Sequence, residues 1–176
     1  MTDKTRSRAI TIVGRSGTGK TTLLIKLVKE LTGRNYRVGC IKHHHGNDFE
    51  IDHQGKDSWL LTQAGVATMM VISPTTTAMV KKNLNSEEPS LVDTLEQYFP
   101  DMDLIFIEGY KNNPLPKIEI FRKECNASLL CRHERYDPSL IAVASDQPLE
   151  LDVPVYDLDD TNAICNFIED YLRRHR

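Results

Sequence analysis

Residues 14–21 have the residue types and spacing of a phosphate-binding loop. They read Gly-Arg-Ser-Gly-Thr-Gly-Lys-Thr, which matches the pattern G-x-x-x-x-G-K-[ST] at every position. Glycines let successive backbone N–H groups turn toward an anion, a lysine reaches the terminal phosphates, and a threonine hydroxyl suits Mg²⁺. We therefore predict a nucleotide–Mg²⁺ site whose residues are Gly14, Ser16, Gly17, Thr18, Gly19, Lys20, Thr21 and Thr22.

A carboxylate that follows an apolar run is the next candidate. Glu108 ends the run 104–107, which predicts a buried strand, and ligands of open α/β sheets bind where the strands end. We expect Glu108 to hold Mg²⁺, directly or through water, or to orient a water for catalysis. Asp103 lies at the other end of the same run, five residues before Glu108 and roughly 16 Å away at ~3.3 Å per residue, so we expect it to lie outside the site.

A second strand-end acid bears on which base is recognised. Asp146 follows the apolar run 140–144. Guanine presents an N1–H and an N2–H that one carboxylate can accept together, whereas adenine has no such pair. The Asn and Lys of the N-K-x-D pattern are replaced by Val143 and Ala144, and a strand-end aspartate is also a common turn former. Guanine recognition and a turn therefore both stay open for Asp146.

The polar stretch 42–57 opens with Lys42 and three histidines, His43 to His45. It follows a predicted strand, so it reaches the same edge of the sheet. It can be a switch-like loop that senses the γ-phosphate and Mg²⁺, a zinc or nickel site, or a solvated loop. Adjacent side chains of an extended segment point in opposite directions, which disfavours three histidines converging on one metal ion.

The elements that position these residues alternate between two periodicities. Short apolar runs predict buried strands, amphipathic stretches predict helices, and the alternating run 117–121 predicts an edge or half-exposed strand. The runs expected to be strands are 9–13, 38–41, 68–72, 76–80, 104–107 and 140–144, and the clearest helices are 20–33 and 161–172. This alternation predicts an α/β fold of the P-loop NTPase type, a three-layer arrangement with a mainly parallel sheet flanked by helices. We expect residues 1–176 to form a single nucleotide-binding domain.

Composition excludes several classes of protein. The net charge of −3 over 176 residues argues against a broad basic surface, so we expect no nucleic-acid partner. No apolar run approaches the ~18–20 residues that cross a bilayer, so we expect no membrane partner. The polar residues 1–6 do not resemble a secretory signal, and the four cysteines form no C-x-x-C pair. We expect reduced thiols and a cytoplasmic protein.

Several motifs together resemble the MobB family of molybdopterin-guanine dinucleotide biosynthesis adaptors. Besides the phosphate loop, they are Ile41-Lys42-His43, the block 52–58 with Gly-Lys-Asp-Ser, Ala64-Gly65, the Glu-Gly-Tyr-Lys of 108–111, and Pro-Lys-Ile-Glu of 116–119. The histidine spacing after position 43 departs from the family pattern. The similarity runs from about residue 8 to the end of the chain.

The resemblance implies a dimeric GTP-binding protein with weak GTPase activity at most. It would assist the guanylyltransferase that joins GMP to molybdopterin, and would meet molybdopterin-handling proteins when the molybdenum cofactor is delivered. Its cofactors would be GTP and Mg²⁺. The resemblance carries phosphate and Mg²⁺ roles onto Gly17, Gly19, Lys20 and Thr21, and Mg²⁺ or catalytic roles onto Asp52 and Glu108.

Two other functions stay open at this point. A small-molecule or nucleotide kinase would use Arg122, Lys123, Arg132 and Arg135 as a cationic lid over the transferred phosphate. A nickel or zinc metallochaperone GTPase would use the histidines 43–45.

Overall fold

The computed structural model describes residues 7–44, 46, 49–83, 87–125, 128–134 and 136–175, without the side chains of 133 and 134. The chain divides into two compact units. We call residues 1–43 with 95–176 the sheet unit, and residues 44–94 the hairpin unit. No helix of the described residues is long and apolar enough to cross a membrane.

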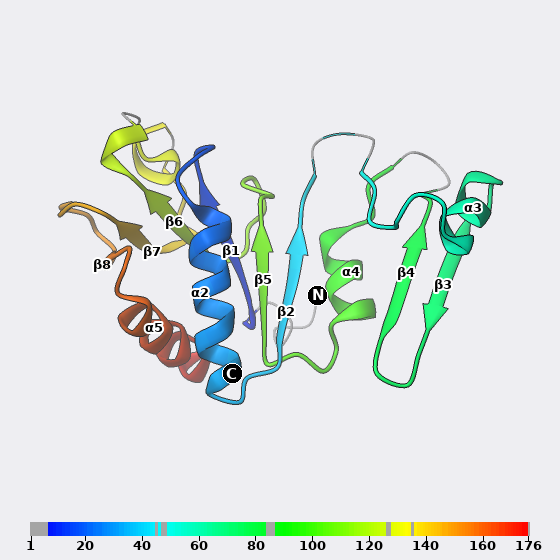
Figure 1. Cartoon of the computed structure of the whole chain (residues 1–176). Coiled ribbons are helices and arrows are strands. Elements are labelled where there is room, and N and C mark those ends of the chain that lie inside the picture. The colour runs from blue at the N-terminus through cyan, green and yellow to red at the C-terminus, as the bar shows by residue number, and fades with distance from the viewer. Residues whose placement is uncertain are drawn as a thin grey trace. The chain divides into compact units, whose positions relative to one another are not determined.

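A six-stranded sheet forms the centre of the sheet unit (Figure 1). Its strand order is β2-β5-β1-β6-β7-β8, and every neighbouring pair is parallel. The strands are β1 Ala9–Gly14, β2 Val38–Lys42, β5 Leu104–Glu108, β6 Lys117–Phe121, β7 Leu140–Ser145 and β8 Val155–Asp157. Because the strands are parallel, the residues that follow them gather at one edge of the sheet.

Two long helices cover one face of this sheet (Figure 1). Helix α2, Lys20–Gly33, buries Leu23, Leu24, Leu27 and Leu31. Helix α5, Thr161–Arg174, begins where Asp160 accepts a hydrogen bond from the Ala163 N–H at 2.9 Å. Their apolar faces pack on alternate strand residues such as Ile10, Ile12, Leu104 and Phe106. The sheet flanked by helices confirms the predicted α/β fold of the P-loop NTPase type.

Shorter helices and helical turns cover part of the opposite face of the sheet. Helix α4, Leu91–Tyr98, buries Leu95, and Phe99 after it packs directly against Gly39 of β2. The short helical turns Lys123–Cys125 and Leu130–Glu134 follow β6. In the hairpin unit, helix α3 (Asp57–Gln63) precedes the antiparallel strands β3 (Thr68–Ile72) and β4 (Thr77–Lys81).

The prediction that 117–121 is an edge or half-exposed strand is wrong. Strand β6 lies between β1 and β7, and Lys117 and Glu119 are almost completely buried. The charged residues of the alternating pattern face an interior polar network instead of water. Such burial is tolerable because each charge is paired or hydrogen-bonded.

Candidate functional site

The phosphate loop joins β1 to α2 at the carboxyl edge of the sheet. Gly17 and Gly19 have φ angles of +81° and +88°, in the left-handed region that favours glycine. A Cβ on Gly14 would lie 2.7 Å from the Ile120 carbonyl oxygen, so the loop begins tightly against β6. The backbone therefore has the sharp turns that let consecutive N–H groups face an anion.

Lys20 lies folded over this loop. Its Nζ donates hydrogen bonds to the carbonyl oxygens of Gly14 at 3.0 Å and Arg15 at 2.7 Å. Burial lowers the pKa of the Lys20 amine, while the negative charge of Glu108 acts in the opposite direction. The amine is thus held at the site by weak carbonyl acceptors, which phosphate oxygens can replace as stronger ones.

Thr21 and Glu108 meet at the end of β5. The Thr21 hydroxyl donates a hydrogen bond to Glu108 Oε1 at 3.0 Å, and Lys42 Nζ lies 3.8 Å from Oε2. The register pairs Glu108 with Ile12 of β1 and with Lys42 of β2. A hydroxyl and a carboxylate oxygen together are the type of donor set that Mg²⁺ prefers.

The other predicted loop residues have different surroundings. Ser16, Thr21 and Thr22 are exposed, whereas Thr18 is buried and its hydroxyl donates to the Arg15 carbonyl at 2.9 Å. Asp103 lies at the other end of β5, where it accepts hydrogen bonds from the backbone and guanidinium of Arg37.

Asp146 lies beside the end of β6. Its Oδ1 accepts the Lys123 N–H at 2.9 Å, and its Oδ2 lies 4.0 Å from Arg122 Nη1. The side chain is still 30% exposed. These contacts fix the orientation of the carboxylate, and guanine recognition by Asp146 stays a prediction.

Asp52 belongs to the hairpin unit. There its Oδ1 accepts the N–H of His53 at 2.8 Å, in the segment that leads to α3. Its predicted role toward Mg²⁺ or catalysis stays a prediction.

Two of the three consecutive histidines are described. The His43 ring packs against Tyr110 in a tilted arrangement, with centroids 4.1 Å apart and 31° between the ring planes, just after the ends of β2 and β5. His44 lies edge-on to Phe49 at 5.8 Å. His45 lies outside the described residues, as does Arg135 of the cationic group considered for a kinase lid. Within the described part of the chain, no three His, Cys, Asp or Glu side chains form a group that could hold a metal ion.

Sequence reasoning considered Arg122 only for the cationic lid of a kinase and missed its direct contact with the phosphate loop. Its Nε donates a hydrogen bond to the Thr18 carbonyl oxygen at 3.0 Å. Its position directly after β6 was the available signal, because the carboxyl ends of neighbouring parallel strands lie at the same edge of the sheet. Arg132, by contrast, holds Asp152 and the carbonyls of Cys131 and Asp137, so it supports local structure.

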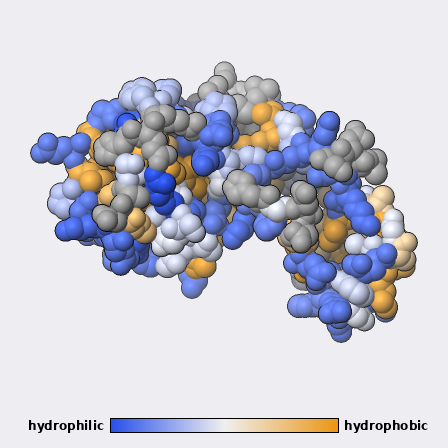
Figure 2. Space-filling view, turned by 90° about the horizontal axis from the view of Figure 1, so that it is seen from above, coloured by the Kyte–Doolittle hydropathy of each residue, from blue (hydrophilic) through white to orange (hydrophobic). Residues whose placement is uncertain are grey.

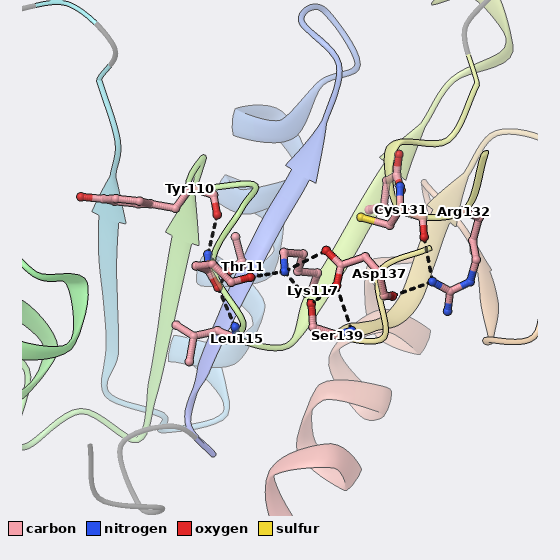
Figure 3. Close-up of polar contacts among 10 residues, drawn as sticks. Thr11, Tyr110, Leu115, Lys117, Cys131, Arg132, Asp137 and Ser139 are labelled. Atoms are coloured by element: carbon pink, nitrogen blue, oxygen red, sulfur yellow. Dashed lines mark hydrogen bonds and ion pairs between the residues drawn. The ribbon is translucent and has the colours of Figure 1, made fainter. Parts of the chain in front are cut away.

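At the amino end of β6, Lys117 anchors a buried polar network (Figure 3). Its ammonium group contacts the Asn113 carbonyl and the Ser139 hydroxyl, and pairs with Asp137 Oδ2 at 3.1 Å. Asn113 in turn bonds the Tyr110 carbonyl and the Thr11 hydroxyl. The network thereby fastens the segment between β5 and β6, which begins directly after Glu108.

Comparison with known proteins agrees with this architecture. The family model described as molybdopterin guanine dinucleotide synthesis protein B matches residues 9–146. The molybdopterin-guanine dinucleotide biosynthesis adapter protein of Haemophilus influenzae is 38% identical over 163 residues, covering 92% of this chain and 87% of the relative. The protein of the same description from Escherichia coli is 37% identical over 180 residues, covering 99% and 98%. A crystal structure of a MobB homologue from Bacillus stearothermophilus has a TM-score of 0.70 at 25% identity, covering 95% of this chain and 99% of that one.

Proposed function

Because the chain belongs to the family of molybdopterin guanine dinucleotide synthesis protein B (MobB), we propose that it is a GTP-binding adapter. It would act in molybdopterin-guanine dinucleotide biosynthesis and in delivery of the cofactor. Its partners would be the guanylyltransferase that makes this cofactor and the proteins that handle molybdopterin. The relatives from Haemophilus influenzae and Escherichia coli carry the adapter description, and they cover most of this chain.

The observation that carries the nucleotide part is the convergence of Lys20, Thr21 and Glu108 at one edge of the sheet. The positive φ angles of Gly17 and Gly19 let the loop turn its N–H groups toward an anion. Lys20 would exchange its two carbonyl acceptors for phosphate oxygens. Thr21 and Glu108 would hold Mg²⁺, which neutralises phosphate charge when bound.

The same geometry favours slow hydrolysis. The Glu108 carboxylate already accepts the Thr21 hydroxyl and faces Lys42, an arrangement that suits holding a cation better than taking a proton from water. We therefore expect the GTPase activity to be weak and binding to be the main event. Asp52 would add to Mg²⁺ binding or catalysis as the MobB resemblance implies.

Nucleotide binding is tested by competition of GTP and ATP against a fluorescent GTP analogue in the presence of Mg²⁺. We expect GTP to bind at least tenfold more tightly, a difference of about 1.4 kcal/mol. Lys20→Ala should abolish binding without unfolding the chain. Lys26→Ala is the matched control, because Lys26 lies on the same helix and pairs with Asp159 at 3.0 Å, away from the loop carbonyls that Lys20 contacts. Equal loss in both variants would contradict the site. Tighter binding of ATP, with ADP formed only when an acceptor is present, would favour a kinase.

A homodimer is the second part of the proposal. The hairpin unit exposes large apolar side chains on one face of β3 and β4: Met70 (47% exposed) pairs across the strands with Met79 (36%), and Ile72 (70%) lies two residues further along β3. Figure 2 shows apolar surface on this unit (orange, at the right of the view). Isolated exposed apolar side chains are ordinary, but adjacent ones of this size mark an interface, and a second copy would cover them. Light scattering should give a dimer for the unaltered chain and a monomer for Ile72→Glu. A monomeric unaltered chain would contradict this part.

A further inference from the structure

Arg122 contacts the phosphate loop at the carbonyl oxygen of Thr18, the side of the peptide opposite its N–H group. Strand β6 places it there: Ile120 pairs with Gly14, and Arg122 follows two residues later. Its Nε donates to the Thr18 carbonyl at 3.0 Å, and its Nε and Nη2 lie 3.6 Å from where a Cβ on Gly19 would be. The guanidinium therefore lies along the Thr18–Gly19 peptide.

This contact has an electrostatic consequence on the inner side of the loop. The Thr18 carbonyl and the Gly19 N–H belong to one peptide group. A cation beside the carbonyl oxygen therefore polarises the N–H and makes it a stronger hydrogen-bond donor. Hydrogen bonds arranged in series strengthen one another in this way, most of all in a medium of low dielectric constant. In loops of this type the backbone N–H groups provide the anion site. A cation behind the peptide thus strengthens a donor in front of it.

Arg122 also faces the carboxylate that is the candidate reader of guanine. Its Nη1 lies 4.0 Å from Asp146 Oδ2 and 3.9 Å from Glu124 Oε1, both at the limit of an ion pair. Asp146 is anchored independently by the Lys123 N–H. The guanidinium therefore forms a hydrogen bond to the loop through Nε and only long ion-pair contacts with the acids. It lies between the phosphate loop and Asp146, the candidate reader of the base.

We propose that Arg122 is a positioning residue that holds the phosphate loop ready for an anion and couples it to Asp146. The inference rests on the proposed nucleotide site and adds to it a residue outside the G-x-x-x-x-G-K-[ST] pattern. It implies that removing Arg122 weakens binding of the phosphate chain itself, with or without a base attached.

Inorganic tripolyphosphate, which has no base, separates these contributions. We expect Arg122→Ala to weaken tripolyphosphate about tenfold, the size of one charge-assisted hydrogen bond, and to weaken GTP by a larger factor, because the variant also loosens Asp146. Asp146→Asn should weaken GTP while leaving tripolyphosphate unchanged. The double variant Arg122→Ala/Asp146→Asn should lose less GTP affinity than the product of the single losses, because the two side chains are coupled.

Arg37→Ala is the matched control, since it removes the same charge where Arg37 pairs with Asp103 at the amino end of β5. Arg122→Lys keeps the charge without the guanidinium and should recover part of the lost affinity. Unchanged tripolyphosphate binding in Arg122→Ala, or a loss equal to that of Arg37→Ala, would overturn the positioning role. Losses that multiply in the double variant would overturn the coupling.

Binding of tripolyphosphate and GTP to the unaltered chain distinguishes failure of this inference from failure of the proposed function. Binding of tripolyphosphate without GTP preference would refute the GTP adapter, while the role of Arg122 would still be decided by its own variant. Failure of the unaltered chain to bind either tripolyphosphate or GTP would refute both. A purely structural role for Arg122 would lower the melting temperature of Arg122→Ala without changing either affinity while the chain is folded.

Discussion

Replacing Lys117 by methionine should strongly destabilise the sheet unit. The side chain is 0% exposed, and methionine is of similar length but cannot donate to Asn113 or Ser139 or pair with Asp137. The Asp137 carboxylate, 11% exposed, would then lose the Lys117 ammonium group while it stays largely buried. Removal of one member of a buried ion pair costs about 3–5 kcal/mol, and we expect a loss of that size.

A second substitution tests whether the negative charge of Asp137 causes the loss of stability in Lys117→Met. Asp137→Asn in the Lys117→Met background removes the carboxylate charge that no longer faces Lys117 and should restore about 1–3 kcal/mol of the free energy of unfolding. In the otherwise unaltered chain, Asp137→Asn should be destabilising, because it leaves Lys117 without an anion. The opposite signs of one substitution in two backgrounds are the specific result expected from a coupled pair.

The assay has to report on the sheet unit. The chain has one tryptophan, Trp59, and it lies in α3 of the hairpin unit, so its fluorescence follows that unit. Urea unfolding is therefore followed by far-UV circular dichroism, with hydrogen exchange of the β1 and β6 amides as a second readout. A loss below about 1 kcal/mol for Lys117→Met, or no recovery on adding Asp137→Asn, would refute the reasoning.

Three further outcomes follow from the same geometry. Glu108→Gln should reduce GTP hydrolysis or its Mg²⁺ dependence more than Asp103→Asn does, and the reverse order in a phosphate-release assay would show that the wrong acid was chosen. Gly14→Ala should lower the melting temperature by several degrees and weaken nucleotide binding, because the added Cβ would lie 2.7 Å from a β6 carbonyl; an unchanged melting curve would contradict this. Burial raises the pKa of Asp137, but hydrogen bonds from Ser139 and the buried lysine outweigh it, so the folded pKa is lowered. The resulting stability is present above the unfolded pKa of about 3.9 and is lost as the pH falls through the folded pKa, so Asp137→Asn should flatten the acid limb of a stability–pH curve.

The parts of the fold that depend on local patterns could be predicted from the sequence. The amphipathic spacing of Leu23, Leu24 and Leu27 predicts α2, and the apolar run before Gly14 predicts β1. Spacing also predicts which of the two acids, Asp103 or Glu108, lies beside the phosphate loop, because the two ends of a strand lie at opposite edges of the sheet. The structure places Glu108 beside Thr21 and Asp103 beside Arg37 accordingly.

What could not be predicted depends on contacts distant in sequence. The alternation of Lys117, Ile118 and Glu119 is the usual pattern of a strand with one wet face. Only the tertiary structure supplies the partners that allow these charges inside: Asp137 for Lys117, and the N–H groups of residues 130 and 131 for Glu119. The contact of Arg122 with Thr18 spans 104 positions and has no local signature either.

The strand order of the sheet has a consequence for synthesis of the chain. Strands β1 and β2 do not pair with each other, because β5 lies between them, and the two neighbours of β1 are β5 and β6. The first strand therefore finds no ladder partner until residues 104–108 have left the ribosome, and its second partner follows with residues 117–121. A nascent chain arrested before that point should expose the apolar residues of β1 and α2, and should rely on chaperones or on speed of translation to avoid aggregation.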